Sequence, residues 1–274
     1  MSGLWLLADS RLPTGGHAHS GGIEAAVRRG LVSAPDDVAG WLGGRVPTAG
    51  LVTAAPSAAA CALAAAAPAP ARALSARGEP SDALVDRTFP SRTGVSERGE
   101  ESAALAGRGF PSCGELRSPD WARWDAAISA RTPVAALREV SRTQGRAMLR
   151  TVRSAWPDAA IDGLGARPHQ ALVLGVATAA ANGSPHDAAA LAVHHLVGQV
   201  CSAAVRLLGL DPLALAGVHA RALDEHRDVI DRAADAGTDA AALDDPDHLP
   251  SATTPLPEVL AVLHARSEGA LFAS

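Results

Sequence analysis

This chain of 274 residues contains no lysine and no tyrosine, and aromatic side chains make up only 3% of it. The absence of lysine excludes a Schiff-base lysine and the lysine of a phosphate-binding loop, so nucleotide chemistry of that kind must come from another protein. The scarcity of aromatic residues disfavours β-strands, whereas the abundant alanine favours helices. The composition therefore predicts an all-α fold.

Cysteine is also scarce, and Cys61, Cys113 and Cys201 do not form a CxxC pair. This pattern excludes a cysteine-rich zinc site and is typical of the reducing cytosol. The net charge of −5 excludes the strongly basic surface of a nucleic-acid-binding protein. The N-terminal residues lack the basic segment of a signal peptide, and the longest apolar run, residues 171–181, is too short to span a bilayer. We therefore expect a cytoplasmic protein that binds no nucleic acid and no membrane.

The chain does contain a repeated helix-start pattern, in which a capping residue precedes a proline of the first helical turn. The capping residues are Ser33, Thr132, Ser184 and Asp211, and apolar residues follow each of them at three- and four-residue spacing. The pattern predicts a single helical bundle domain of about eight to ten helices. The helices that we expect cover residues 35–46, 50–67, 121–130, 133–155, 169–181, 185–208, 212–236 and 257–266.

Residues 68–118 do not follow this pattern. They are rich in Pro, Arg, Glu, Ser and Gly, and they show no sustained apolar period. Such a segment cannot bury enough apolar surface to offset the entropy of ordering its backbone. We expect a disordered insertion, which divides the helical domain into residues 1–67 and 119–274.

The most unusual stretch lies near the N-terminus, at residues 4–29. A short apolar turn runs into Leu12 and Pro13, after which Gly15-Gly16 and Gly21-Gly22 place four glycines within eight residues. Glycine is used where the backbone must take positive φ or approach another group closely. The residues alone predict a helix–loop–helix corner in which Ser20 caps the helix that opens at Ile23.

This stretch resembles the N-terminal signature of the UreF family of urease accessory proteins. The matching residues are Leu12, Pro13, Gly15, Gly16, His17, His19, Ser20, Gly22, Ile23 and Glu24. Further matches follow in the family's order at residues 141–146, 169–175, 185–188, 202–211 and 271–274, so the resemblance covers roughly four fifths of the chain. Ala270 stands where the family's tail usually has arginine, so we expect no anchoring contact from that position.

The resemblance implies an all-α adaptor that performs no chemistry itself and acts as a homodimer. It implies binding to UreD (also called UreH), to the nickel-carrying GTPase UreG and to apo-urease, with nickel loaded into urease in a GTP-dependent step. No tightly bound cofactor is expected. The residues implied in partner binding are Leu12, Pro13, Gly15, Gly16, Ser20, Gly22, Glu24, Arg206 and Phe272.

Ten histidines raise the question of a metal site. His17 and His19 could share a nickel or zinc ion, but Asp9 is the one acid nearby and the coordination stays incomplete. We therefore expect a transient nickel contact at the surface of a complex and no tight site in the monomer. A small helical metal-dependent hydrolase that uses these residues, or a purely structural helical protein, are the alternatives to the adaptor.

Charged residues of the expected helices have more than one interpretation. Glu24 either supports the first turn of its helix through the dipole, holds the N-terminal turn, or recognises a partner. Arg206 is either paired at a subunit boundary or extends along an apolar surface. Arg142, Arg146 and Arg150 share one helix face, which is typically solvated but could meet an acidic partner.

Histidines on two later helices are expected to have no ligand role. The helix at residues 185–208 is apolar nearly all round, which suits the centre of a bundle or a dimer interface. His194 and His195 are adjacent on it and cannot form an HExxH pair, so one of them should be a polar residue within a packed helix. His219 and His226 are expected on a solvated or partner-facing stripe.

Overall fold

The computed structural model describes residues 2–9, 12, 19–67, 118–156 and 159–266, and these residues belong to one unit. Within these ranges the chain forms helices and no β-strand, which confirms the all-α prediction. The expected insertion at residues 68–118 lies outside the described part of the chain, apart from Ser118. The division of the domain around it therefore stays a prediction.

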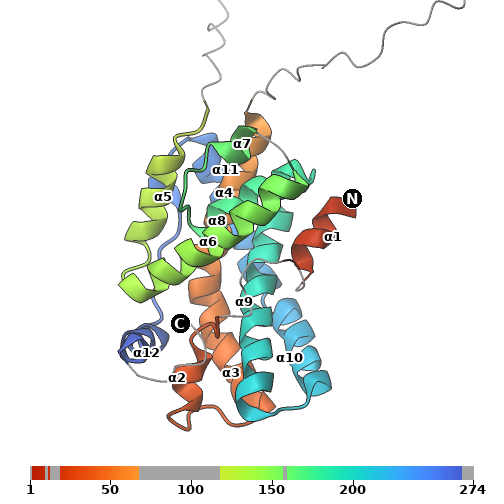
Figure 1. Cartoon of the computed structure of the whole chain (residues 1–274), viewed down its shortest axis with the longest axis vertical. Helices are drawn as coiled ribbons and strands as arrows, with labels where there is room; N and C mark the ends of the chain where they lie inside the picture. The colour runs from red at the N-terminus through yellow and green to blue at the C-terminus, as the bar shows by residue number, and fades with distance from the viewer. Residues whose placement is uncertain (1, 10–11, 13–18, 68–117, 157–158, 267–274) are drawn as a thin grey trace, which may run out of the picture. The chain divides into compact units, whose positions relative to one another are not determined.

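The helices have the following bounds, and Figure 1 labels most of them. The N-terminal part contains α1 (Ser2–Ala8), α2 (Ile23–Val27), α3 (Pro35–Arg45), the π-helical turn η2 (Val46–Gly50) and α4 (Leu51–Ala66). The remainder contains α5 (Trp121–Ala130), α6 (Ala135–Ala155), α7 (Ala159–Asp162), α8 (Gln170–Ala180), α9 (Pro185–Leu208), α10 (Pro212–Glu225), α11 (Arg227–Ala242), the 3₁₀ turn η3 (Pro246–His248) and α12 (Pro255–Ala265).

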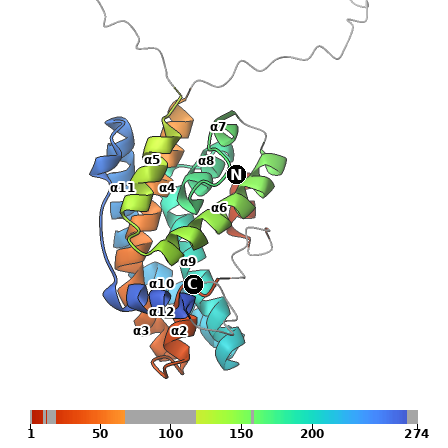
Figure 2. The ribbon, with the colours of Figure 1, turned by 60° about the vertical axis from the view of Figure 1, so that its left-hand side comes forward.

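The helices pack around α4 and α9. Helix α4 contacts α8, α9 and α11, while α9 also contacts α8, α10 and α11. Helix α6 runs obliquely across α8, and α12 lies beside α2 at the end of the bundle where the signature is found (Figures 1 and 2). The core between them is built from Leu7, Trp124, Met148, Leu172 and Leu174, together with many alanines.

Several predicted helix limits are confirmed and others are wrong. Residues 121–130 and 185–208 form helices with the predicted limits. The predicted helix at 212–236 is in fact two, because His226 leaves the helical conformation between α10 and α11. The predicted helices at 35–46 and 50–67 are joined, because η2 carries the chain from α3 into α4 without a break. The short helices α1 and α7 were missed.

Two of the four predicted capping residues are correct. The hydroxyl of Ser184 accepts a hydrogen bond from the backbone N–H of Asp187, and the carboxylate of Asp211 accepts one from Leu213. The N-cap of α3 is Ala34 instead of Ser33, and that of α6 is Val134 instead of Thr132. At the start of α3 the carboxylate of Asp37 forms the capping contacts instead, because it accepts hydrogen bonds from the backbone N–H groups of Ser33 and Ala34. These hydrogen bonds lower the pKa of Asp37.

Helix α9 is covered by helices of its own chain. Of the two predicted alternatives, the centre of a bundle and a dimer interface, this matches the first. Val197 and Val200 have no exposed surface within the single chain. Two helical stretches, Pro35–Ala66 and Pro185–Leu208, are nevertheless long and apolar enough to cross a membrane. The prediction from the sequence rested only on uninterrupted apolar runs and therefore underestimated the length of apolar helix. More than half of the most apolar window of each is buried inside the protein, as in core helices of soluble proteins.

Helix α4 approaches α8 and α11 so closely that only glycine fits at the crossing points. A Cβ atom added at Gly175 of α8 would lie 2.2 Å from the carbonyl oxygen of Ser57, and one added at Gly237 of α11 would lie 2.3 Å from that of Ala55. These oxygens belong to backbone, which cannot move away without shifting the helix. The small residues of α4 thus bring three helix backbones into contact.

We therefore expect Gly175→Ala to lower the free energy of unfolding by about 2 kcal/mol or more, because α4 and α8 must separate. Gly43→Ala in α3 is the matched control, since a Cβ there meets no atom within 4 Å. It should raise the free energy of unfolding by about 0.5 kcal/mol through the entropy of the unfolded chain. Urea unfolding followed by far-UV circular dichroism measures both, and equal effects of the two changes would contradict the close-approach argument.

Candidate partner-binding site and its cavity

The structure describes five of the nine residues implied in partner binding. Leu12 lies shortly after α1, Ser20 and Gly22 lie just before α2, Glu24 lies in α2, and Arg206 lies in the last turn of α9. The other four, Pro13, Gly15, Gly16 and Phe272, fall outside the described residues, as does His17, one of the two residues of the possible nickel contact.

The second glycine pair of the signature shapes the turn before α2. Gly21 and Gly22 have φ angles of 60° and 85°, which side chains of L-residues rarely adopt. Gly22 is the N-cap of α2, so the expected capping role of Ser20 is wrong. The hydroxyl of Ser20 is buried and has no hydrogen-bond partner among the described residues. A Cβ atom at Gly21 would lie 2.8 Å from Cγ2 of Val200, so this turn also packs directly on α9.

Glu24 is completely buried between two elements. Its Oε1 accepts hydrogen bonds from Nη2 and Nε of Arg28 at 2.9 and 3.2 Å. Its Oε2 lies 3.5 Å from Nε2 of His264, a buried residue in the last turn of α12. Of the three interpretations of Glu24, these contacts match the one in which it holds the N-terminal turn. They also join the signature to α12.

The histidines of α9 form hydrogen bonds with backbone carbonyl oxygens at the end of α1. Nε2 of His195 donates to the carbonyl oxygen of Leu7 at 2.8 Å, and Nε2 of His194 donates to that of Ala8 at 3.3 Å. Because His194 uses its Nε2 proton in this way, its Nδ1 accepts from Nε2 of His219 at 3.1 Å. His219 is half-buried and lines a cavity of about 430 Å³ together with His194, so the solvated alternative is wrong for it, and the partner-facing alternative stays a prediction.

Burial keeps these histidines neutral. It lowers the pKa of His195 to about 4 against the opposing hydrogen bond to Leu7, and it lowers the pKa of His219 to about 4 with a further contribution from His194. No group of three or more His, Cys, Asp or Glu residues in the described ranges is arranged to hold a metal ion. His19 is buried on the wall of another cavity, and the transient nickel contact of His17 and His19 stays a prediction.

A second motif of the sequence, at residues 141–146, builds a partly buried polar network. Arg142 forms an ion pair with Asp125 of α5 at 2.6 Å, so it does not lie on a solvated face as expected, whereas Arg146 and Arg150 are exposed. The hydroxyl of Ser141 lies 2.9 Å from Nδ1 of His169. Gly145 lets α6 touch the start of α8, since a Cβ atom there would lie 2.1 Å from the carbonyl oxygen of Pro168. The network was missed because the sequence does not show that Asp125 faces α6.

His169 is the centre of this network. Its Nε2 lies 2.9 Å from the hydroxyl of Ser129, and its backbone N–H donates to Asp125. Burial lowers the pKa of His169 to about 4, although the charge of Asp125 opposes the shift. The imidazole therefore acts as a neutral bridge between α5, α6 and α8.

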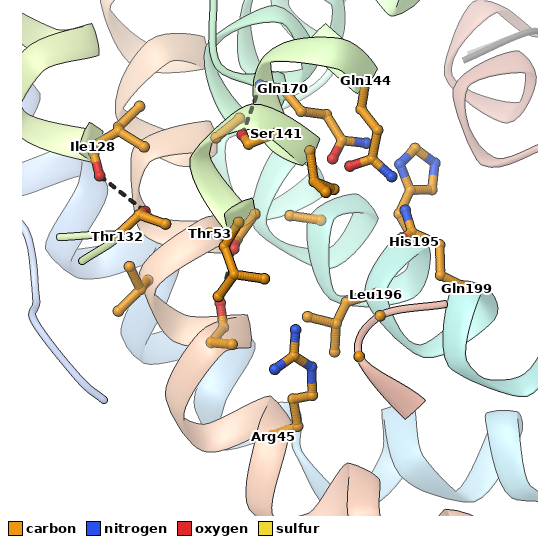
Figure 3. Close-up of a pocket in the computed structure, with 18 of the residues that line it drawn as sticks. Arg45, Thr53, Ile128, Thr132, Ser141, Gln144, Gln170, His195, Leu196 and Gln199 are labelled. Atoms are coloured by element: carbon orange, nitrogen blue, oxygen red, sulfur yellow. Dashed lines mark hydrogen bonds between the residues drawn. The ribbon is translucent and has the colours of Figure 1, made fainter. Parts of the chain in front are cut away.

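The signature also borders a cavity of about 160 Å³. Its walls come from the signature itself, from α3, α4, α6, α8 and α9, and from the start of α12. Figure 3 shows that the guanidinium of Arg45 points into this space from one end, while the side chains of Gln144 and His195 lie at the other. No sequence pattern marked Arg45, because its burial depends on how α3 continues into η2.

Arg206 is exposed at the surface, and its Nη2 donates to the hydroxyl of Ser202 one turn earlier at 3.1 Å. The last turn of α9 therefore presents a cation to solvent, away from the apolar face of the helix. Its role in partner binding stays a prediction.

Removing the carboxylate of Glu24 should cost stability. Glu24→Ala leaves buried His264 without this neighbour, and we expect the free energy of unfolding to fall by about 3 kcal/mol. Arg28→Ala removes the half-exposed partner and should cost about 1 kcal/mol or less. Thermal melting at pH 7.5 measures both; a Glu24→Ala protein as stable as the wild type would show that this buried pair does not hold the turn.

Acid should destabilise the fold before the carboxylates titrate. His169, His195 and His219 have folded pKa values near 4 and unfolded values of 6.5, so the unfolded chain takes up protons first as the pH falls. The free energy of unfolding is therefore unaffected by the titration of these histidines above pH 6.5, and it falls as the pH is lowered from 6.5 towards 4. We expect His195→Gln, which keeps a donor for Leu7, to reduce this loss by at most about 3 kcal/mol. Urea unfolding at pH 7.5, 5.5 and 4.5 measures it, and an unchanged pH profile would contradict the assignment.

Comparison with known proteins places the chain beside one family. The model of the UreF family matches residues 32–223. The chain is 36% identical to a protein named urease accessory protein UreF from Mycolicibacterium vanbaalenii over 273 residues, covering 99% of this chain and 97% of that protein. It is 35% identical to a protein of the same name from Mycobacterium marinum over 271 residues, covering 99% of this chain and 97% of that protein. It is 36% identical to a protein of the same name from Mycobacterium tuberculosis over 210 residues, covering 76% of this chain and 74% of that protein.

Proposed function

This chain belongs to the UreF family of urease accessory proteins, and from that premise we propose that it acts in the cytoplasm as an adaptor for nickel delivery to urease. In this role it binds UreD and the GTPase UreG as a homodimer, and the assembly loads nickel into apo-urease in a GTP-dependent step. The adaptor itself catalyses no reaction and holds nickel only in transit. The near-complete match to relatives named urease accessory protein UreF is the observation that carries the proposal.

One surface of the structure supports a role in assembly. Leu256, Val259 and Leu263 follow one another at three- and four-residue spacing on α12, and they are 53%, 56% and 41% exposed. Leu260 and Ala261, between them, are buried against the bundle. A short helix that buries one face and exposes apolar residues on the other is typical of a protein-binding element.

A buried residue of the signature contacts α12, the helix that carries this exposed apolar surface. Glu24 lies next to His264, and this contact fixes α12 against α2 with its apolar residues facing outwards. The signature thus contributes to partner binding by positioning α12, even where its own side chains are buried. The expectation of a homodimer rests on the family alone, since the cover that α9 needs comes from its own chain.

We expect Val259→Glu to weaken assembly by about tenfold or more, because it places a charge within an apolar contact. Since Val259 is exposed, the fold should be unaffected. Leu213→Glu is the matched control, as Leu213 is 81% exposed on α10 and lies on another helix. Co-purification with UreD and UreG, together with urease activity at limiting nickel, measures the effect on each partner. Full activation by the Val259→Glu protein would contradict the role of α12, and failure of the wild type to restore activity to a strain lacking its UreF would contradict the function.

A further inference from the structure

The cavity beside the signature contains a buried cation that forms no ion pair with any described residue. Arg45 is only 8% exposed, and its Nε has no hydrogen-bond partner among the described residues. Within those residues no carboxylate lies at ion-pair distance from its guanidinium. Glu258, at the start of α12, is near enough to influence the charge but is used to accept from the backbone N–H of Thr254 at 3.1 Å. Burial lowers the pKa of Arg45 to about 10, so the guanidinium remains charged at neutral pH.

Two other partly buried arginines differ from Arg45, because both have acceptors for their guanidinium groups. Arg131, on the wall of the same cavity, donates to the backbone carbonyl oxygens of Ala127, Asp247 and Leu249. Arg142 is paired with Asp125. A buried guanidinium is strongly disfavoured unless an anion or several acceptors replace its water. Arg45 makes no such direct contact with the described residues, since Glu258 acts on it from beyond ion-pair distance, and its side chain points into the cavity (Figure 3).

A second donor opens onto the same space. Gln144 is 4% exposed, and its Nε2 has no hydrogen-bond partner among the described residues. The wall between the two donors includes the apolar side chains of Val52, Leu174 and Leu196. Two unused donors separated by apolar surface match a ligand with an anionic end, a short apolar body and a second acceptor.

The signature borders this space with a glycine. Gly22 lines the cavity, and a Cβ atom there would be in ordinary contact with Cζ of Arg45, at 3.9 Å. Its φ of 85° also disfavours any other residue at this position. The cavity of about 160 Å³ is large by comparison with the roughly 10–15 Å³ that one water needs on the same measure.

We propose that this cavity binds a carboxylate, which forms a two-pronged ion pair with the guanidinium of Arg45. The amide of Gln144 donates to a second acceptor of the same ligand. A guanidinium matches a carboxylate in geometry as well as charge, because two parallel N–H groups meet two oxygens. The volume of about 160 Å³ favours a free small organic acid over a protein side chain with its backbone. The proposal does not depend on nickel delivery.

Binding is tested with the full chain and two carboxylate probes. Succinate represents a free acid, and N-acetyl-glutamate-N-methylamide represents a glutamate side chain of a protein, with the glutamine analogue as its neutral control. Isothermal titration at constant ionic strength measures affinity, and thermal melting measures the stabilisation that a ligand specific to the folded state produces. Binding of succinate assigns the site to a free acid, whereas binding of the blocked glutamate alone assigns the same carboxylate site to a protein side chain.

Two variants and a control separate binding from structure. Arg45→Met keeps the length of the stem and should reduce carboxylate affinity by about tenfold or more. It should also melt no lower than the wild type without ligand, because it removes an unpaired buried charge. Gln144→Leu should reduce affinity about threefold. Arg131→Met, on the same wall, should lower the melting temperature and leave affinity unchanged.

Three results would overturn the proposal. One is that neither probe binds the wild type. Another is that Arg45→Met binds the probes as tightly as the wild type. A third is that Arg45→Met melts well below the wild type without ligand, which would show that the guanidinium already has a stabilising partner within the chain.

Discussion

The bundle depends on the close approach of the α4 backbone to α8 and α11. Gly175 and Gly237 lie where the helices cross, and each faces a backbone carbonyl oxygen of α4 at a distance that leaves no room for a methyl group. From Ala54 to Ala66 most residues of α4 are alanine. A protein with so few aromatic side chains cannot fill wide gaps between helices, so it brings the helices closer and gains stability from many short contacts. The position of α9, and with it the cavity walls, follows from this arrangement.

The smaller cavity lies where several helices and the signature meet. Residues of α3, η2 and α4 line it on one side, and Gly21 and Gly22 of the signature border it. Polar groups such as those of Gln144 and Arg45 border an interior space that a leucine-rich or phenylalanine-rich core would have closed.

Most of the fold could be predicted from the sequence because helix signals are local. Proline after a capping residue located α9 and α10, and composition marked residues 68–118 as different. Contacts between helices could not be predicted in this way. The break at His226 lies within an unbroken helical pattern, and the pairing of Asp125 with Arg142 depends on the rotation of α5 against α6. The same limit applies to the site: the resemblance identified Glu24, but only the fold shows that its partners are Arg28 and His264.

The signature and α12 are coupled through charge as well as packing. Glu24 fixes the last turn of α12 through His264, and Glu258 in the first turn lines the cavity and supplies the nearest negative charge to Arg45. A carboxylate bound to Arg45 would neutralise the guanidinium and place a second negative charge near Glu258. The attraction that draws the start of α12 towards the cavity would then weaken, while the contact at its last turn would remain. Both ends of the helix that exposes Leu256, Val259 and Leu263 are thus held by charged groups next to the signature.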